Sequence, residues 1–411
     1  RERGGSNAHG ERRAAFTIGR AARLGLDHRP RRDGQANALL FDHPVSRDDL
    51  NLNLDKLGLS LRRIVQTFSQ VDSDTAAESD RETIFDYYSL TSDRLLLPDP
   101  VVKAIEDRWP NRELTQTTTY LANAIERLGE GGDVIATVPY STITAVDSID
   151  ELPLDYSSGP EQAADGTIPV VVNDWTARRL DAQVGTRLRV AYYEPEVENG
   201  KEIERFFDAT VTGIVPITEP ATPYRRNGRP ATFDSSPTVY NDPDLTPLVP
   251  GVTDQDSISD WDLPFPLERE IEKEDDLYWN NHRLTPKLFM PLADGERLFG
   301  SRFGKTTGLR LRSDIAPDME TLESEISSTL APITDELGWA VLPIREQQLS
   351  ASKGTTPFDG LFLALSFFVI FAAVMLIAML FRLGLLQRTR QFGMLQAVGW
   401  PARKVARLAV G

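Results

Sequence analysis

The stretch GSRFGKTTG (300–308) contains Gly304-Lys305-Thr306, which are the last three residues of a phosphate-binding loop. The complete loop needs a glycine five positions before Gly304, so that its backbone N–H groups can surround the phosphates, but Phe299 occupies that position. Such a loop also opens a helix, whereas the next residues, GLRLR, alternate apolar and basic like a strand. The sequence therefore predicts a glycine-rich turn leading into a strand, and no bound nucleotide.

No other side chains have the spacing of a catalytic or zinc site. No histidine is spaced for metal binding with another histidine or a glutamate, and the nucleophile motif G-x-S-x-G is absent. We therefore expect a protein that is not an enzyme. We also expect its four histidines to lie on the surface: His9, His28, His43 and His282.

The acidic segment 241–262 is the best candidate for a metal site. Its carboxylates are the hard oxygen ligands that Ca²⁺ prefers, but their spacing does not match an EF-hand loop. A solvated loop with aspartate turns is the alternative, so we predict no metal and leave calcium as an open question. Trp261 and Phe265 are expected to attach this loop to the domain. The candidate ligands are Asp254, Asp256, Asp260 and Asp262.

Composition restricts the partners. The 411 residues include 61 acidic and 45 basic side chains, a net charge of −16, and no Lys/Arg-rich tract, so we expect no nucleic acid to bind. There is no cysteine, which excludes disulfides and thiolate metal sites. The sequence starts at Arg1 and stops within a helical pattern, and we expect it to be a fragment of a longer protein.

Residues 360–381, GLFLALSFFVIFAAVMLIAMLF, contain no charge and one polar residue, Ser366. As a helix this run is about 33 Å long at ~1.5 Å per residue, which is the thickness of a bilayer core. A buried core helix is usually shorter and has a polar stripe. The sequence predicts a transmembrane helix over 358–382.

Charge on the two sides of this helix predicts its orientation. The residues after Phe381 include six basic side chains and no acid, so the positive-inside rule places them in the cytoplasm. Of the 61 acidic residues, 60 lie in residues 1–350, which we therefore expect outside the cytoplasm. An earlier span or a cleaved signal would be needed to export them.

The extracytoplasmic residues read as mixed helices and strands. We expect an alternating strand at the start of 50–68, a helix at 99–110, a hairpin at 117–148, a strand–helix–strand unit at 168–196, and a strand at 205–217. Residues 218–283 are irregular and rich in Pro, Asp and Asn, which predicts an extended arm that is either packed or mobile. A strand at 308–312, a helix at 321–333 and a strand at 339–345 would form a β-α-β element.

These elements predict an α+β extracytoplasmic domain of two or so subdomains, followed by one transmembrane helix and a cytoplasmic segment. The predicted parts are an incomplete N-terminal part (1–130), a β-rich subdomain (131–225), a Pro/Asp-rich arm (226–307), a membrane-proximal β-α-β element (308–350), the transmembrane helix (358–382) and a cytoplasmic loop (383–411).

Residues 387–408, QRTRQFGMLQAVGWPARKVARL, predict an amphipathic helix next to the membrane. Phe392, Leu395 and Val398 recur at a spacing of three, Gly399 is placed to end the helix, and Pro401 can begin another. A helix lying on the membrane surface fits the same basic pattern. The alternative is a helix that docks on a partner.

This segment resembles the FtsX-like permeases of ABC transporters, of the MacB and lipoprotein-release type. The residues QFGMLQAVG (391–399) match the pattern [E/Q]-[F/I]-G-[M/L]-L-x-A-[V/I/L]-G that follows the second transmembrane helix in that family. Gln391 stands where the family usually has an acid, and Gln396 where it often has a basic residue. We therefore expect apolar packing to contribute more than charge.

The resemblance implies that this helix is a coupling helix, which docks on the ATPase subunit. The residues to which it assigns that role are Arg388, Arg390, Gln391, Phe392, Gly393, Met394, Leu395, Ala397 and Gly399.

The outer residues are also similar to the large periplasmic core domain of MacB-type permeases, over VNDWTARRLDAQVGTRLRV and DATVTGIVPI. The resemblance implies an inner-membrane permease subunit in a bacterium, with ATP bound by a separate cytoplasmic ABC ATPase. It also implies a second permease copy or paralogue, contact with membrane lipid, and a lipid-linked or peptide cargo. The rival interpretation is a membrane-anchored extracytoplasmic receptor or enzyme whose last helix is only an anchor.

Overall fold

The computed structural model describes residues 41, 45–46, 52–69, 81–110, 113–129, 131–157, 166–196, 202–223, 231–249, 251–263, 265–352 and 358–410. Residues 1–45 group apart from residues 46–411, and all described helices and strands belong to the second group. The described strands are β1 Leu59–Phe68, β2 Glu82–Ser92, β3 Leu114–Leu128, β4 Val134–Ala145, β5 Ile168–Asn173, β6 Arg187–Tyr193, β7 Glu204–Val215, β8 Leu288–Met290 and β9 Gly308–Arg312.

The described helices include α1 Leu54–Leu57, α2 Asp99–Arg108, α3 Asp174–Leu180, α4 Lys273–His282, α5 Leu292–Phe299, α6 Met319–Leu330, α7 Ile344–Ser352, α8 Phe358–Gln387, α9 Thr389–Ala397 and α10 Ala402–Val410. Four short 3₁₀ turns are η5 Val239–Asn241, η6 Pro243–Leu245, η7 Ile258–Asp260 and η8 Ala331–Ile333.

Six strands close into a barrel in the order β3-β4-β8-β5-β7-β6, because β6 pairs back onto β3. The pairs β4–β8 and β5–β7 are parallel, and the other pairs are antiparallel. The predicted hairpin is confirmed as β3–β4, and the predicted strand–helix–strand unit is confirmed as β5-α3-β6. Strand β8, only three residues long, completes the closure by bridging β4 and β5.

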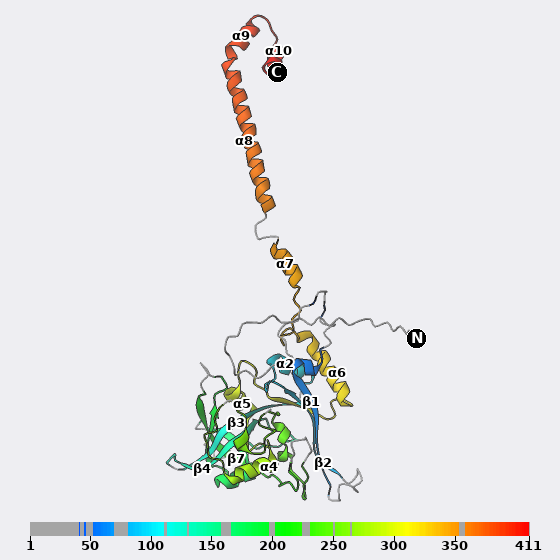
Figure 1. Cartoon of the computed structure of the whole chain (residues 1–411), viewed down its shortest axis with the longest axis vertical. Coiled ribbons are helices and arrows are strands. Elements are labelled where there is room, and N and C mark those ends of the chain that lie inside the picture. Colours follow the sequence, from blue (N-terminus) through cyan, green and yellow to red (C-terminus); the bar gives the residue numbers. More distant parts are fainter. Residues whose placement is uncertain are drawn as a thin grey trace, which may run out of the picture. The chain divides into compact units, whose positions relative to one another are not determined.

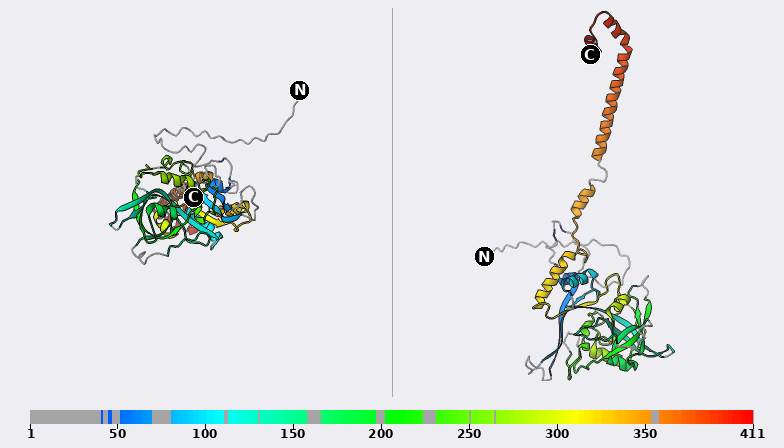
Figure 2. Two further views of the ribbon diagram at one scale, coloured as in Figure 1. Left: turned by 90° about the horizontal axis from the view of Figure 1, so that it is seen from below. Right: turned by 180° about the vertical axis from the view of Figure 1, so that it is seen from behind.

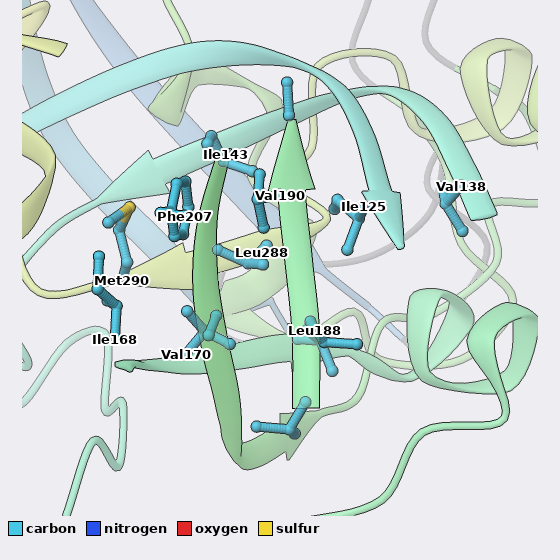
Figure 3. Close-up of a cluster of buried hydrophobic side chains, with 14 of the residues drawn as sticks. Ile125, Val138, Ile143, Ile168, Val170, Leu188, Val190, Phe207, Leu288 and Met290 are labelled. Carbon is cyan, nitrogen blue, oxygen red and sulfur yellow. The ribbon is translucent and has the colours of Figure 1, made fainter. Parts of the chain in front are cut away.

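Alternate residues of each barrel strand point inward and form the largest core. Figure 3 shows side chains from different strands gathered inside the barrel, among them Val190, Phe207 and Leu288. Leu188 and Val190 are fully buried there. Burial of apolar side chains at about 25 cal/mol per Å² is the main stabilising contribution to such a core.

Helix α5 packs on the barrel through Phe299, the residue that breaks the phosphate-loop pattern. Its ring stacks on Tyr120 with the centroids 4.6 Å apart and meets the edge of Tyr192 at 5.2 Å. Gly295 allows this approach, because a Cβ there would lie 2.1 Å from the Cβ of Ala145. The turn at 300–307 then leads into β9, as the sequence predicted.

Strands β1, β2 and β9 extend the sheet beyond the barrel in the order β1-β2-β9-β3. Strand β3 belongs to both parts, because residues 114–117 pair with β9 and residues 118–128 pair with β4. Helices α2 and α6 contact each other and cover one face of this open sheet, over a core that includes Leu90, Leu309 and Leu311 (Figures 1 and 2). The predicted helices at 99–110 and 321–333 are thus confirmed as α2 and α6.

The described residues of the irregular stretch 218–283 (218–223, 231–249, 251–263 and 265–283) form a packed arm. Trp261 is buried and meets Trp279 edge-on at 4.8 Å, and Phe265 contacts Tyr193 at 4.6 Å, so both aromatic residues attach the loop as predicted. The sequence did not reveal α4, which carries Trp279.

The predicted fold class is wrong. A closed β-barrel with three extra strands does not fit the expected α+β domain of the MacB periplasmic core type. The membrane-proximal β-α-β element is also wrong, since β9 is an internal strand of the sheet and residues 339–343 form no strand. Val341 and Leu342 are apolar, but they are 39% and 62% exposed, and none of the described strands pairs with this segment. The predicted domain limits stay predictions.

Candidate docking site

Helix α8 is the one helix in the described part of the chain that is long and apolar enough to cross a membrane. It contains the predicted apolar run 360–381 without a break, and none of its side chains is buried by the rest of the described protein. Leu363 and Phe367 are 76% and 70% exposed. Because water would hydrate this surface at a high cost in free energy, a helix of this kind needs an apolar surrounding.

Helix α9 follows α8 after a single residue. Arg388, at the N-cap of α9, donates its backbone N–H to the carbonyl of Leu385 at 3.2 Å, and the Thr389 hydroxyl donates to the carbonyl of Leu386 at 2.8 Å. These bonds continue from the last turn of α8 into the first residues of α9. The predicted coupling residues are therefore attached directly to the apolar helix.

The end of α9 is fixed by a left-handed turn at Gly399, as the sequence predicted. Gly399 has φ +92°, and its N–H donates to the carbonyl of Gln396 at 3.0 Å. The N–H of Trp400 donates back to the carbonyl of Leu395 at 3.1 Å. This pair of bonds is the Schellman motif, which prefers glycine at the left-handed position. Pro401 then precedes α10.

The two faces of α9 differ in exposure. Phe392 and Leu395 are half-buried, and α9 contacts both α8 and α10, whose Val405 is only 5% exposed. The opposite face is formed by residues at spacings of three, four and seven, which lie in one row on a helix. That face consists of Arg390, Gly393, Met394 and Ala397, all exposed, with Gln391 and Val398 beside it.

Helix α10 is basic and amphipathic. Arg403, Lys404 and Arg407 lie on one side of it and Val405 on the other, as a helical spacing requires. A basic amphipathic helix is typical of a membrane surface. The two interpretations of residues 387–408, a membrane-surface helix and a docking helix, therefore apply to different helices. Helix α10 has the membrane-surface pattern, and α9 has an exposed face of small and apolar residues.

No protein-family model matches this chain. A search of curated proteins also gives no significant match.

The other residues singled out in the sequence are not brought together. The four candidate calcium ligands are exposed, and no group of three or more metal-ligating side chains occurs in the described ranges. His282 is 1% exposed, so its predicted surface position is wrong. Its ring Nε2 lies 3.1 Å from Glu219, and burial lowers its pKa. His9, His28 and His43 lie outside the described residues.

A buried lysine lies close to a small cavity inside the domain. Lys287 is 3% exposed, and its Nζ lies 5.0 Å from the centroid of Trp175 and 4.9 Å from that of Tyr278. Burial lowers the pKa of Lys287 to about 8, against the attraction of Asp275. The cavity beside it is about 10 Å³, which is room for about one water molecule and too small for a substrate.

A second buried charge network joins the open sheet to the arm. Asp242 is fully buried and accepts hydrogen bonds from the Tyr87 hydroxyl at 2.7 Å and from the Asp244 N–H at 2.9 Å. Arg310 lies 3.9 Å from the same carboxylate and 3.8 Å from the Tyr87 ring centroid. Burial raises the pKa of Asp242 to about 6, and the positive charge of Arg310 opposes that rise.

Sequence reasoning missed this network. Arg310 was assigned to the basic positions of an alternating strand, and nothing local connects it to residues 87 or 242. The strand GLRLR was the one local signal of the network. A charged side chain on the covered face of an internal strand needs a hydrogen-bonding or ionic partner.

Proposed function

We propose that this chain is the permease subunit of an ABC transporter, in which α9 docks on a separate cytoplasmic ATPase. In this account α8 crosses the bacterial inner membrane, the barrel and open sheet lie outside the cytoplasm, and α9 and α10 lie inside. ATP is bound by the ATPase and not by this chain. Movement of the ATPase would pass through α9 and α8 to the outer residues, which act on a lipid-linked or peptide cargo.

The observation that carries the proposal is the exposed face of α9. Gly393 and Ala397 leave a shallow surface beside Met394, which is 64% exposed. Small residues allow a partner's backbone to approach closely, and methionine adapts its shape to a partner. Phe392 and Leu395 are half-buried and less accessible to a partner, so we assign docking to Met394 and its neighbours.

Basic residues support the orientation. Arg382 and Arg388 lie at the end of α8, and Arg403, Lys404 and Arg407 belong to α10. Positive charge next to a membrane span favours the cytoplasmic side. A second permease copy would complete the transporter, because ABC ATPases work as dimers in the family that the sequence resembles.

The test is capture of the ATPase by the complete chain in lipid nanodiscs. Candidate ABC ATPase subunits from the same organism are mixed with the wild type and with Met394→Arg, and co-elution and ATP hydrolysis are measured. We expect Met394→Arg to weaken capture about tenfold, because a buried unpaired charge costs several kcal/mol. Gln396→Arg adds the same charge on the other side of α9 and is the matched control. Equal capture by both variants would contradict docking through the exposed face.

A second candidate function, a membrane-anchored receptor, is favoured by one observation. An open cleft of about 610 Å³ lies beside the buried Asp242 network, a volume typical of ligand sites. The receptor function requires a ligand in that cleft and no ATPase on α9. ATPase capture therefore separates the two functions.

A further inference from the structure

The cleft lies against the face of the open sheet that α2 and α6 do not cover. Residues on that face pair across the strands, so that Phe85, Tyr87, Arg310 and Thr115 share it. Facing them from the arm and from the loop after β4 are Ile149, Pro153 and Val239. The cleft therefore has an apolar wall on each side, and Arg310 and Arg312 are the basic residues that the sheet contributes to its lining.

One strand edge in this cleft has no partner within the described residues. Strand β2 pairs with β1 over Glu82–Ser92, but with β9 only over Tyr87–Thr91. Strand β9 ends at Arg312, opposite Tyr87. Residues 83–86 line the cleft, and the backbone groups on that edge lie where β9 would continue. An unpaired edge next to apolar walls is the arrangement in which an extended peptide adds as a further strand.

Arg310 supplies a donor with no partner. The residue is 9% exposed, and in the described part of the chain its Nη1 has no hydrogen-bond acceptor. Its other terminal nitrogen lies 3.9 Å from Asp242, whose oxygens already accept from Tyr87 and Asp244. Because a buried donor without an acceptor costs about 1–3 kcal/mol, a carbonyl oxygen of a ligand in the cleft would be stabilising.

The rim of the cleft is acidic. Glu113, Asp150, Glu151 and Asp314 are exposed there, whereas Asp86 is half-buried and already binds Arg63 at 2.8 Å. Arg312 is the exposed basic residue among the lining side chains, and it binds Asp314 at 2.9 Å and lies 3.6 Å from Glu151. With Asp242 beside Arg310, the net charge repels a simple anion and attracts a ligand with basic side chains.

We propose that the cleft binds an extended, basic peptide segment, which adds as a short strand along residues 82–86 of β2. A backbone carbonyl of the peptide accepts a hydrogen bond from Arg310, and basic side chains of the peptide meet Glu113 and Asp150 at the rim. Apolar side chains on its other face pack on Phe85, Ile149 and Val239. This inference goes beyond the proposed function, since either a permease or an anchored receptor can use such a cleft.

The test uses the complete chain in nanodiscs of zwitterionic lipid, without any ATPase. The probe is the fluorescein-labelled, C-terminally amidated heptapeptide Lys-Val-Lys-Val-Lys-Val-Lys, measured by fluorescence anisotropy with empty nanodiscs as the blank. We expect the same peptide with Glu in place of Lys to bind at least about tenfold more weakly. A peptide N-methylated at alternate backbone nitrogens should also lose binding, because it cannot form the strand hydrogen bonds.

Variants locate the site. Arg310→Gln and the rim pair Glu113→Gln/Asp150→Asn should each weaken binding about tenfold. The matched control Glu274→Gln/Glu320→Gln removes two exposed acids elsewhere and should leave binding unchanged. If Arg310→Gln does not fold, the exposed rim pair still tests the proposal. Hydrogen exchange at residues 82–86 should slow when the lysine peptide is added.

Three results would overturn the proposal: equal binding of the lysine and glutamate peptides, undiminished binding of the N-methylated peptide, or an unchanged affinity of the rim pair. Since no ATPase is present, any of these leaves the docking of α9 untouched.

Discussion

The domain built from the barrel and open sheet differs from the C-terminal helices α8–α10 in where its apolar side chains go. In the barrel, Leu188 and Leu288 are fully buried by the protein's own strands. In α8, Leu363 is 76% exposed although α8 is more apolar than any other described helix. The domain thus stabilises itself, whereas the apolar surface of α8 is not covered by the described part of the chain. We propose that a bilayer surrounds α8 and that another protein covers the exposed face of α9.

The largest expected effect comes from replacing a leucine by alanine in the barrel, and the same replacement in α8 is the comparison. Leu188→Ala should lower the free energy of unfolding of the domain by about 2–5 kcal/mol, because it leaves a cavity in a closed core. Leu363→Ala should leave it unchanged, because α8 contributes nothing to that core. Denaturant unfolding followed by tryptophan fluorescence measures both. A comparable loss in both variants would show that α8 packs on the domain.

The next effect concerns the surroundings of α8. Ile370→Arg places a charge in the middle of the apolar run and should cost about 2.5–3.5 kcal/mol of membrane insertion. The fraction of the chain that stays in membranes after alkaline extraction measures the loss, and Ile370→Leu is the control. If the arginine variant is retained as fully as the leucine variant, α8 does not span the bilayer.

A third effect concerns a buried titratable group inside this self-stabilised domain, the carboxylate of Asp242. The folded-state pKa of Asp242 is about 6, above its ordinary value of 3.8. The folded protein therefore binds a proton more tightly than the unfolded chain, and this contribution to stability is present at low pH and lost as the pH rises through about 6. The loss is at most about 3 kcal/mol.

Asp242→Asn should remove this pH dependence. The free energy of unfolding is measured from pH 4 to pH 8 for both proteins, and the difference between the curves isolates Asp242 from the other carboxyl groups. The wild type should lose stability relative to the variant between about pH 4 and pH 6. A difference that does not change with pH would show that Asp242 titrates normally.

The smallest expected effect distinguishes two glycines of the proposed docking helix. Gly399→Ala should destabilise the end of α9 by about 1 kcal/mol, because φ +92° is unfavourable for alanine. Gly393→Ala should instead stabilise the helix by up to about 1 kcal/mol, since Gly393 lies inside α9 and has open space around it. Hydrogen exchange of residues 388–400 should therefore speed up in one variant and slow down in the other. The same direction of change in both would contradict the turn at Gly399.

The sequence predicted local elements well and their long-range pairing poorly. Runs of β-branched residues around the glycines at 129–132 identified the β3–β4 hairpin, and Gly399 with Pro401 identified the α9–α10 turn, because each signal lies within a few residues. The barrel could not be predicted in this way. Its closure depends on β3 pairing with both β4 and β6, and on a three-residue strand, β8, that has no periodicity to detect.

In the candidate site, too, local features were predictable from the sequence and long-range contacts were not. Motif residues placed α9 correctly, but only the structure separates the half-buried Phe392 and Leu395 from the exposed Met394. The network of Tyr87, Asp242 and Arg310 joins residues more than 60 positions apart, so no local pattern could indicate it.

The central claim, that the exposed face of α9 binds an ATPase, is tested most directly by crosslinking in membranes. The chain has no cysteine, so Met394→Cys and the half-buried Leu395→Cys each provide one thiol, once any cysteine elsewhere in the full-length protein has been removed. Each variant is expressed with candidate ATPase subunits and treated with a thiol crosslinker, with and without ATP. The account predicts an adduct at residue 394 that changes with ATP and little or none at residue 395. No adduct with any ATPase, or equal adducts at both positions, would contradict it.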